Sequence, residues 1–189
     1  LKGASQISST EKNYINSLSN YCSSYITEST NTSNYMSKLL NDVNGDNDLA
    51  NLTDPSQIST VFGEYSQTFK DGNASLETYK QKLIKLKNDA SNLQSPAGLE
   101  SFKSDYINNI DTEIKSLDTI KGYIDTYASI FDSIKEAFKS LDMNVVQQKF
   151  TELESFNDKY INDLKKLPSG EDNIKKLNDR LTKIKNSMQ

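Results

Sequence analysis

The chain has 189 residues, of which 34% are hydrophobic and 25% charged, with a formal net charge of −4 and neither histidine nor tryptophan. Histidine is the usual general base near neutral pH and the commonest metal ligand, so its absence excludes serine and cysteine catalytic triads, ordinary zinc sites and the histidine-containing di-iron sites of helical bundles. The sequence therefore predicts a protein with no catalytic site, no metal site and no cofactor.

Charge and hydropathy argue against two classes of partner. A single arginine, an isoelectric point of about 5.0 and the lack of a basic cluster argue against nucleic acid, because phosphate binding needs Lys and Arg gathered on one face. Mean hydropathy is −0.70, and the longest uncharged stretch, residues 13–27, is mostly Asn, Ser and Tyr rather than the roughly 18 apolar residues of a membrane span. We expect no transmembrane segment, while contact with a membrane surface is left open.

The polar residues indicate an exported protein. The chain contains 20 Asn, 25 Ser, 13 Thr and 21 Lys against its single Arg. This surface chemistry resembles that of exported proteins more than that of cytosolic ones, so we expect an extracellular or cell-surface, lipoprotein-like location, with the cytoplasm as the alternative. The only cysteine, Cys22, cannot form an internal disulfide and lies on an apolar stripe, which predicts a buried and unreactive thiol.

The first predicted helix covers residues 8–42. Ser8 and Glu11 have the spacing of a capping box at its start. Residues 27–34 have poor helix propensity, because their side chains are β-branched or compete for backbone hydrogen bonds, so packing must keep them helical. Apolar residues share one face of this helix: Tyr14, Ile15, Leu18, Tyr21, Cys22, Tyr25, Ile26, Met36, Leu39, Leu40 and Val43.

The segment that follows, residues 42–48, places oxygen-bearing side chains at alternate positions, as the first half of an EF-hand calcium loop does. The sixth position is Asn47 instead of glycine, and the twelfth is Thr53 instead of the bidentate glutamate. The sequence therefore favours a polar loop between helices, with calcium binding as the less favoured alternative.

The second and third predicted helices cover residues 55–93 and 96–141. Each begins with a capping residue followed by proline, Asp54-Pro55 and Ser95-Pro96. In both helices apolar residues recur at alternating intervals of three and four residues and form an apolar seam, which is typical of coiled-coil-like packing. The short connection between the two helices predicts an antiparallel pair.

Two kinds of polar side chain interrupt these seams. Glu113 is the one charged seam residue of the third helix, and it can be either a buried functional acid or, as we favour, a place where packing loosens. Tyr65, Tyr79, Tyr106 and Tyr127 also lie on seams. Tyrosine rings at such positions are more typical of a core, with hydroxyls reaching its rim, than of a ligand cleft.

The last part of the chain is predicted as residues 144–167 and 171–188, interrupted near Pro168. Asp142 or Asn144 can cap the first of these pieces. A kink at Pro168 would make the two pieces together as long as the other helices, so we favour a kink over a reversal. The final piece sets basic residues around an apolar stripe, as surface-binding amphipathic helices do, but acidic residues among them favour an ordinary solvated bundle face; the basic residues are Lys175, Lys176, Arg180, Lys183 and Lys185.

The pattern as a whole predicts an all-α protein: one domain over residues 1–189, folded as an elongated, antiparallel up-down four-helix bundle with coiled-coil-like packing. The favoured function is a non-catalytic scaffold or protein-binding module with an unidentified protein partner. The alternative is a bundle that interacts with lipid or membranes, as apolar-ligand carriers and helical toxins do. The wide apolar face of residues 117–141 suggests that alternative.

Overall fold

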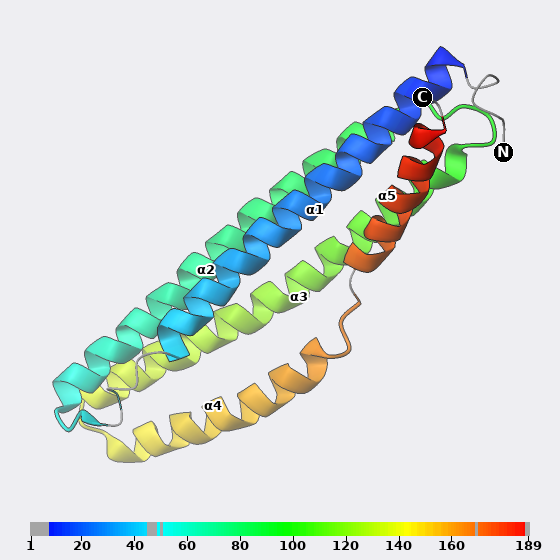
Figure 1. Cartoon of the computed structure of the whole chain (residues 1–189). Coiled ribbons are helices and arrows are strands. Elements are labelled where there is room, and N and C mark those ends of the chain that lie inside the picture. The colour runs from blue at the N-terminus through cyan, green and yellow to red at the C-terminus, as the bar shows by residue number, and fades with distance from the viewer. Residues whose placement is uncertain (1–7, 45–48, 50, 169, 188–189) are drawn as a thin grey trace. The chain divides into compact units, whose positions relative to one another are not determined.

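The computed structural model describes residues 8–44, 49, 51–168 and 170–187 (Figure 1). The part of the chain so described contains helices and no strand, which confirms the prediction of an all-α protein. No helix in it has a stretch that is both long and apolar enough to cross a membrane. The helices are α1 (Ser9–Asn44), α2 (Pro55–Ser91), α3 (Glu100–Lys139), α4 (Met143–Leu164) and α5 (Glu171–Asn186).

Capping residues read from the sequence mark the starts of three helices. The Ser8 hydroxyl oxygen accepts a hydrogen bond from the Glu11 N–H at 3.1 Å, and the Asp54 carboxylate accepts one from the Ser56 N–H at 2.9 Å. Asp142 accepts from the Val145 N–H at 3.2 Å. Each bond satisfies a backbone donor that has no partner within its helix, so α1, α2 and α4 begin within one residue of the predicted positions.

The start of α3 differs from the prediction. Residues 96–99 form a turn in which the Leu99 N–H donates to the Pro96 carbonyl at 3.0 Å, and α3 begins only at Glu100. Gly98 has a φ of +87°, a left-handed conformation that glycine adopts without steric cost. The Ser95-Pro96 pair therefore opens a turn, and the helix starts four residues later than predicted.

The chain is broken, and not kinked, near Pro168. The N–H groups of Lys166 and Leu167 close a last tight turn after α4, and the Pro168 carbonyl accepts a hydrogen bond from the Ser116 hydroxyl at 2.6 Å. Proline has no N–H group and disfavours a helical conformation in the residue before it. The described residues consequently contain five α-helices, where the sequence pattern counts four with the last one kinked.

Contacts divide the chain into two compact units. Unit 1 comprises residues 1–31, 78–116 and 168–189, and unit 2 comprises residues 32–77 and 117–167. Each unit combines parts of α1, α2 and α3 with one further helix, which is α5 in unit 1 and α4 in unit 2. The sequence pattern holds no signal for this division, because the apolar seams continue through it.

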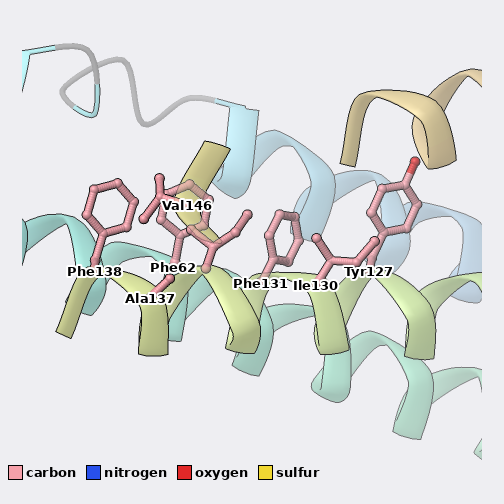
Figure 2. Close-up of a cluster of buried hydrophobic side chains, with 8 residues drawn as sticks. Phe62, Tyr127, Ile130, Phe131, Ala137, Phe138 and Val146 are labelled. Atoms are coloured by element: carbon pink, nitrogen blue, oxygen red, sulfur yellow. The ribbon is translucent and has the colours of Figure 1, made fainter. Parts of the chain in front are cut away.

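The core of unit 2 is rich in aromatic rings (Figure 2). The ring of Phe62 lies 6.0 Å from that of Phe131 and 6.2 Å from that of Phe138, measured between centroids. Ile130 and Ala137, which widen the apolar face of α3, are buried in the same cluster. The face that suggested lipid binding is therefore used for packing inside unit 2.

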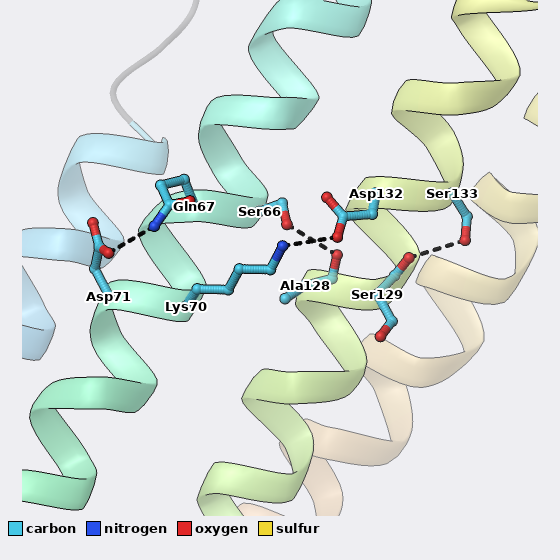
Figure 3. A network of polar contacts seen from close by, with 8 residues as sticks. All are labelled: Ser66, Gln67, Lys70, Asp71, Ala128, Ser129, Asp132 and Ser133. Carbon is cyan, nitrogen blue, oxygen red and sulfur yellow. Dashed lines mark hydrogen bonds and ion pairs between the residues drawn. The ribbon is translucent and has the colours of Figure 1, made fainter.

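Two small residues bring α2 close to α3 in unit 2. The buried hydroxyl of Ser59 donates to the backbone carbonyl of Lys135 at 3.0 Å. The buried hydroxyl of Ser66 donates to the backbone carbonyl of Ala128 at 3.2 Å (Figure 3). Residue numbers rise along α2 as they fall along α3, so these parts of the two helices run in opposite directions. Small side chains allow helices to approach closely, and the buried hydroxyls gain partners through that approach.

In unit 1 the apolar stripe of α5 is a packing face. Ile174, Leu177 and Leu181 are buried. The guanidinium carbon of Arg180 lies 4.7 Å from the centre of the Phe102 ring, in a cation–π arrangement. The favoured interpretation of the last helix, a bundle helix with a solvated basic side, agrees with this burial.

Candidate functional site

Most residues that the sequence singled out are part of the core. Cys22 is fully buried, and burial raises the pKa of its thiol to about 12, so it is unreactive at neutral pH. Tyr79, Tyr106 and Tyr127 are buried as well, and Tyr65 is half-buried. The Tyr106 hydroxyl donates to the Tyr21 carbonyl at 3.0 Å, and the Tyr127 hydroxyl donates to Asn157 at 2.7 Å. These tyrosines have the core role that the heptad pattern predicts.

The calcium-binding alternative for residues 42–48 lies outside the described residues. The structure gives no placement for residues 45–48 and none for the side chains of residues 42–44. Among the residues that it does describe, no group of three or more Asp, Glu, Cys or His side chains is placed to hold a metal ion.

Glu113 lies in a buried polar cluster of unit 1. Its carboxylate accepts a hydrogen bond from the Gly170 N–H, at the start of α5, at 3.4 Å. Burial raises the pKa of Glu113, while that N–H group and the hydroxyls of Tyr25 and Tyr79 partly oppose the rise. The nearby Glu171 carboxylate raises it further. Helices α1, α2, α3 and α5 all contribute a side chain or a backbone group to this cluster.

The two tyrosines of the Glu113 cluster are held in their protonated form. Both hydroxyls are buried, and neither forms a hydrogen bond of good geometry with a described residue. Burial, and after it the charge of Glu113, raises the pKa of Tyr25 and of Tyr79. The arrangement can hold a proton and orient the first turn of α5, a structural role that differs from the loosened packing expected at Glu113.

A second candidate lies on the surface of unit 2. The described residues include six large hydrophobic side chains that are strongly exposed, and five of them lie on α4 or immediately before it. We call these five the α4 edge: Leu141, Met143, Phe150, Ile161 and Leu164, with exposed fractions of 64%, 56%, 38%, 44% and 41%. Large apolar side chains that gather in this way mark sites of interaction more often than single exposed ones do.

Helical geometry places the α4 edge in a line. At about 100° of rotation per residue, its four helical members fall within an arc of roughly 60°. This arc borders the face of α4 that packs in the core, where Val146 is buried. Two tyrosines of α3 hold α4 in place: the Tyr123 hydroxyl donates to Asp163 at 2.8 Å, and Tyr127 donates to Asn157. The edge is therefore a fixed surface.

The first residue of the edge, Leu141, has a strained backbone. Its φ is +56°, and the N–H of the next residue, Asp142, donates to the Ala137 carbonyl at 3.1 Å, as at a helix end closed by a left-handed residue. Glycine or asparagine is the usual residue here, because a left-handed conformation costs other residues roughly 1–2 kcal/mol. Leu141 thus combines a strained backbone with the most exposed large apolar side chain of the edge.

The opposite border of α4 is polar. An open groove of about 340 Å³ is lined there by seven residues, of which only Ile130 is apolar, and Lys149 in it forms an ion pair with Glu152 at 2.9 Å. Small-ligand pockets are lined mainly by apolar and aromatic groups. The groove is consequently a weaker candidate than the α4 edge.

Sequence reasoning missed the α4 edge. Leu141, Phe150 and Leu164 follow Phe138, Val146 and Tyr160 at intervals of three or four residues, a spacing that predicts a shared buried face, yet all three are strongly exposed. Periodicity shows which residues share a helix face, but it does not show whether a neighbouring helix covers that face. Comparison with protein-family models, with curated proteins and with solved structures finds no match.

Proposed function

We propose that this protein is a non-catalytic helical module that binds another protein through the α4 edge. The single observation that carries the proposal is that, of the six strongly exposed large hydrophobic side chains among the described residues, five lie on α4 or immediately before it. Burial of apolar surface is the main favourable term in protein association, at about 25 cal/mol per Å². A partner that covers the edge gains this term without rearranging the helix beneath it.

The strain at Leu141 supports the proposal independently. Glycine at this position would relieve the left-handed strain, so the leucine side chain is kept at a cost to stability. Strained residues of this kind cluster at binding and catalytic sites, where a functional gain offsets the cost. Because 64% of Leu141 is exposed, its side chain is available for a contact outside the folded chain.

Two further expectations belong to this proposal. We propose that each unit is an antiparallel, up-down bundle of four helical segments, supported in unit 2 by the opposed directions of α2 and α3 in the Ser59 and Ser66 contacts. We also propose an extracellular or cell-surface location. Its support is compositional, namely the abundance of Asn, Ser and Lys.

Site-specific photo-crosslinking tests the proposed function. A photoreactive amino acid is placed at Ile161, on the edge, or at its neighbour Asn162, which is exposed on a different side of α4. Both proteins are irradiated in the cells that produce this protein, and adducts are identified by mass spectrometry. We expect one dominant protein adduct from position 161 and none from position 162. Equal labelling from both positions, or none from position 161, would contradict the proposal.

A further inference from the structure

We propose that the occupant of the α4 edge is a basic amphipathic helix of the partner protein. This inference rests on the proposed function and adds the chemical class of the partner. Three observations carry it: the charge of unit 2, the acidic side chains beside the edge, and the spacing of the apolar residues along α4.

The charge of the chain is divided unevenly between the two units. Unit 2 contains nine Lys against sixteen Asp and Glu, a net charge of −7, whereas unit 1 contains thirteen Lys and Arg against ten Asp and Glu, a net charge of +3. The overall charge of −4 conceals this difference. A surface of one sign attracts partners of the opposite sign and repels those of the same sign, which raises both the rate and the specificity of association. The edge lies wholly in the acidic unit.

Acidic side chains also lie beside the apolar edge itself. Asp142 separates Leu141 from Met143, and Glu154 and Asp158 lie on the solvent side of the arc that the edge occupies. All three are exposed. Exposed lysines flank the two ends of the edge, since Lys139 precedes Leu141 and Lys165 follows Leu164, whereas Glu154 and Asp158 border its middle. Most of the edge therefore offers an apolar strip with carboxylates along one border, which a helix with an apolar stripe and flanking Lys or Arg complements.

The shape of the edge favours a helix over an extended chain. Its helical members are separated by intervals of 7, 11 and 3 residues along α4, which are the intervals at which two packed helices meet. The 22 residues of α4 give the strip a length of about 33 Å. A partner helix of five or six turns spans this length, and helices recognised in this way use anchors at i, i+3, i+4 and i+7.

Binding of synthetic peptides to the full chain tests the inference. Three fluorescent peptides of equal length are compared: a basic amphipathic helix with Leu at heptad positions and Lys beside them, a version with Glu in place of Lys, and a scrambled basic version without an apolar stripe. Anisotropy is measured at about 0.05 M and about 0.5 M NaCl, because exposed charges are largely screened at the higher salt. We expect only the basic amphipathic peptide to bind, and its Kd to rise several-fold at high salt.

Matched variants locate the binding. Ile161→Asp adds a charge on the edge, and Asn162→Asp adds the same charge one residue away on another side of α4. We expect the first variant to weaken binding at least about tenfold, as loss of an interface anchor does, and the second to change it less than about twofold. Circular dichroism and thermal melting confirm that both variants are folded. Equal effects of the two variants, or equal binding of the scrambled peptide, would overturn the inference.

Two other occupants give different outcomes. If the full chain self-associates in sedimentation experiments and Ile161→Asp abolishes that association, the edge binds a second copy of the chain. If the full chain co-sediments with vesicles of zwitterionic or anionic lipid and the same variant abolishes this, the edge binds lipid. Either result overturns the inference. A crosslinked protein partner at position 161 that lacks a basic amphipathic helix would overturn the inference while leaving the proposed function intact.

Discussion

The Glu113 carboxylate accepts a hydrogen bond from the Gly170 N–H at 3.4 Å, across 57 residues of sequence. Gly170 is the N-cap residue of α5, and no side chain caps this helix. The Glu113 carboxylate of α3 therefore takes the place of a capping side chain at the buried start of α5, where the helix dipole favours a negative charge. The same carboxylate is half-buried, and its partial burial raises its pKa, so the bond links the packing of α5 to a titratable group.

We predict that Glu113→Gln stabilises the protein at neutral pH. Burial raises the pKa of Glu113 above the value of 4.5 for a free side chain, so the folded state binds the proton more tightly than the unfolded state does. The stabilising contribution of this group is complete below pH 4.5 and is lost as pH rises through the pKa of the folded state. Above the raised pKa the wild type holds a half-buried charge that glutamine lacks. The free energy of unfolding, measured in urea, should be higher for the variant than for the wild type at pH 7 and no higher at pH 4.

The control for this change is Glu136→Gln, which alters an exposed carboxylate on the same helix. We expect a change of no more than about 0.5 kcal/mol at either pH, because exposed ion pairs contribute little. A Glu113→Gln variant that is less stable than the wild type at pH 7 would show that the ionised form is needed to hold α5.

A second prediction contrasts two glycines. A Cβ atom at Gly170 would lie 2.5 Å from the backbone oxygen of Asn109, so Gly170→Ala must displace α5 from α3. The cost should be about 1–3 kcal/mol, as for other over-packed sites. Gly122, in an exposed part of α3, has no atom within 4 Å of the added Cβ, so Gly122→Ala should stabilise by about 1 kcal/mol. Chemical denaturation measures both, and a neutral Gly170→Ala would refute the close contact.

A third prediction concerns the strained residue of the α4 edge. Leu141→Gly should raise the free energy of unfolding by about 1 kcal/mol, because glycine adopts the left-handed conformation without strain. The same change should weaken binding of the partner or of the basic peptide, because it removes the most exposed apolar side chain of the edge. Leu141→Asn, which tolerates the conformation but is polar, should also lose binding. A variant that gains stability and keeps full binding would show that Leu141 does not contribute to the binding surface.

A fourth prediction uses the only cysteine as a probe of unit 1. Because burial raises the pKa of Cys22 to about 12, we expect its reaction with a disulfide reagent at pH 8 to be at least about a hundredfold slower in the folded protein than in urea. The labelling rate should follow the unfolding of unit 1 as urea increases. Fast labelling without denaturant would show that α1 opens locally around this residue.

Local signals in the sequence account for much of the fold. Capping side chains and prolines lie next to the helix ends they mark, so Asp54, Asp142 and Pro168 predict boundaries through interactions within a few residues. The same logic misplaced the start of α3, because Pro96 fits position i+1 of a turn as well as the first turn of a helix. Gly98, with its positive φ, is what distinguishes the two cases.

The candidate sites depend on contacts between residues far apart in the chain, so the sequence predicts them less well than it predicts the helix ends. Glu113 was singled out because a charge on an apolar seam is unusual, but its partner Gly170 belongs to a separate helix that no periodicity connects to it. Phe150 shows the converse limit. Its ring centroid lies 5.6 Å from that of Phe62, as its spacing from Val146 predicts, yet 38% of it is exposed.

The interleaving of the two units along the chain has a consequence for synthesis. Unit 2 ends at residue 167, whereas unit 1 needs residues 168–189 for completion, although it also contains the N-terminal part of α1. Tyr14, Ile15 and Leu18, which are translated before any residue of unit 2, belong to a unit that is completed only by α5, translated after all of unit 2. Unit 2 can therefore close first, and truncation before α5 would leave the N-terminal part of α1 without one of its packing partners.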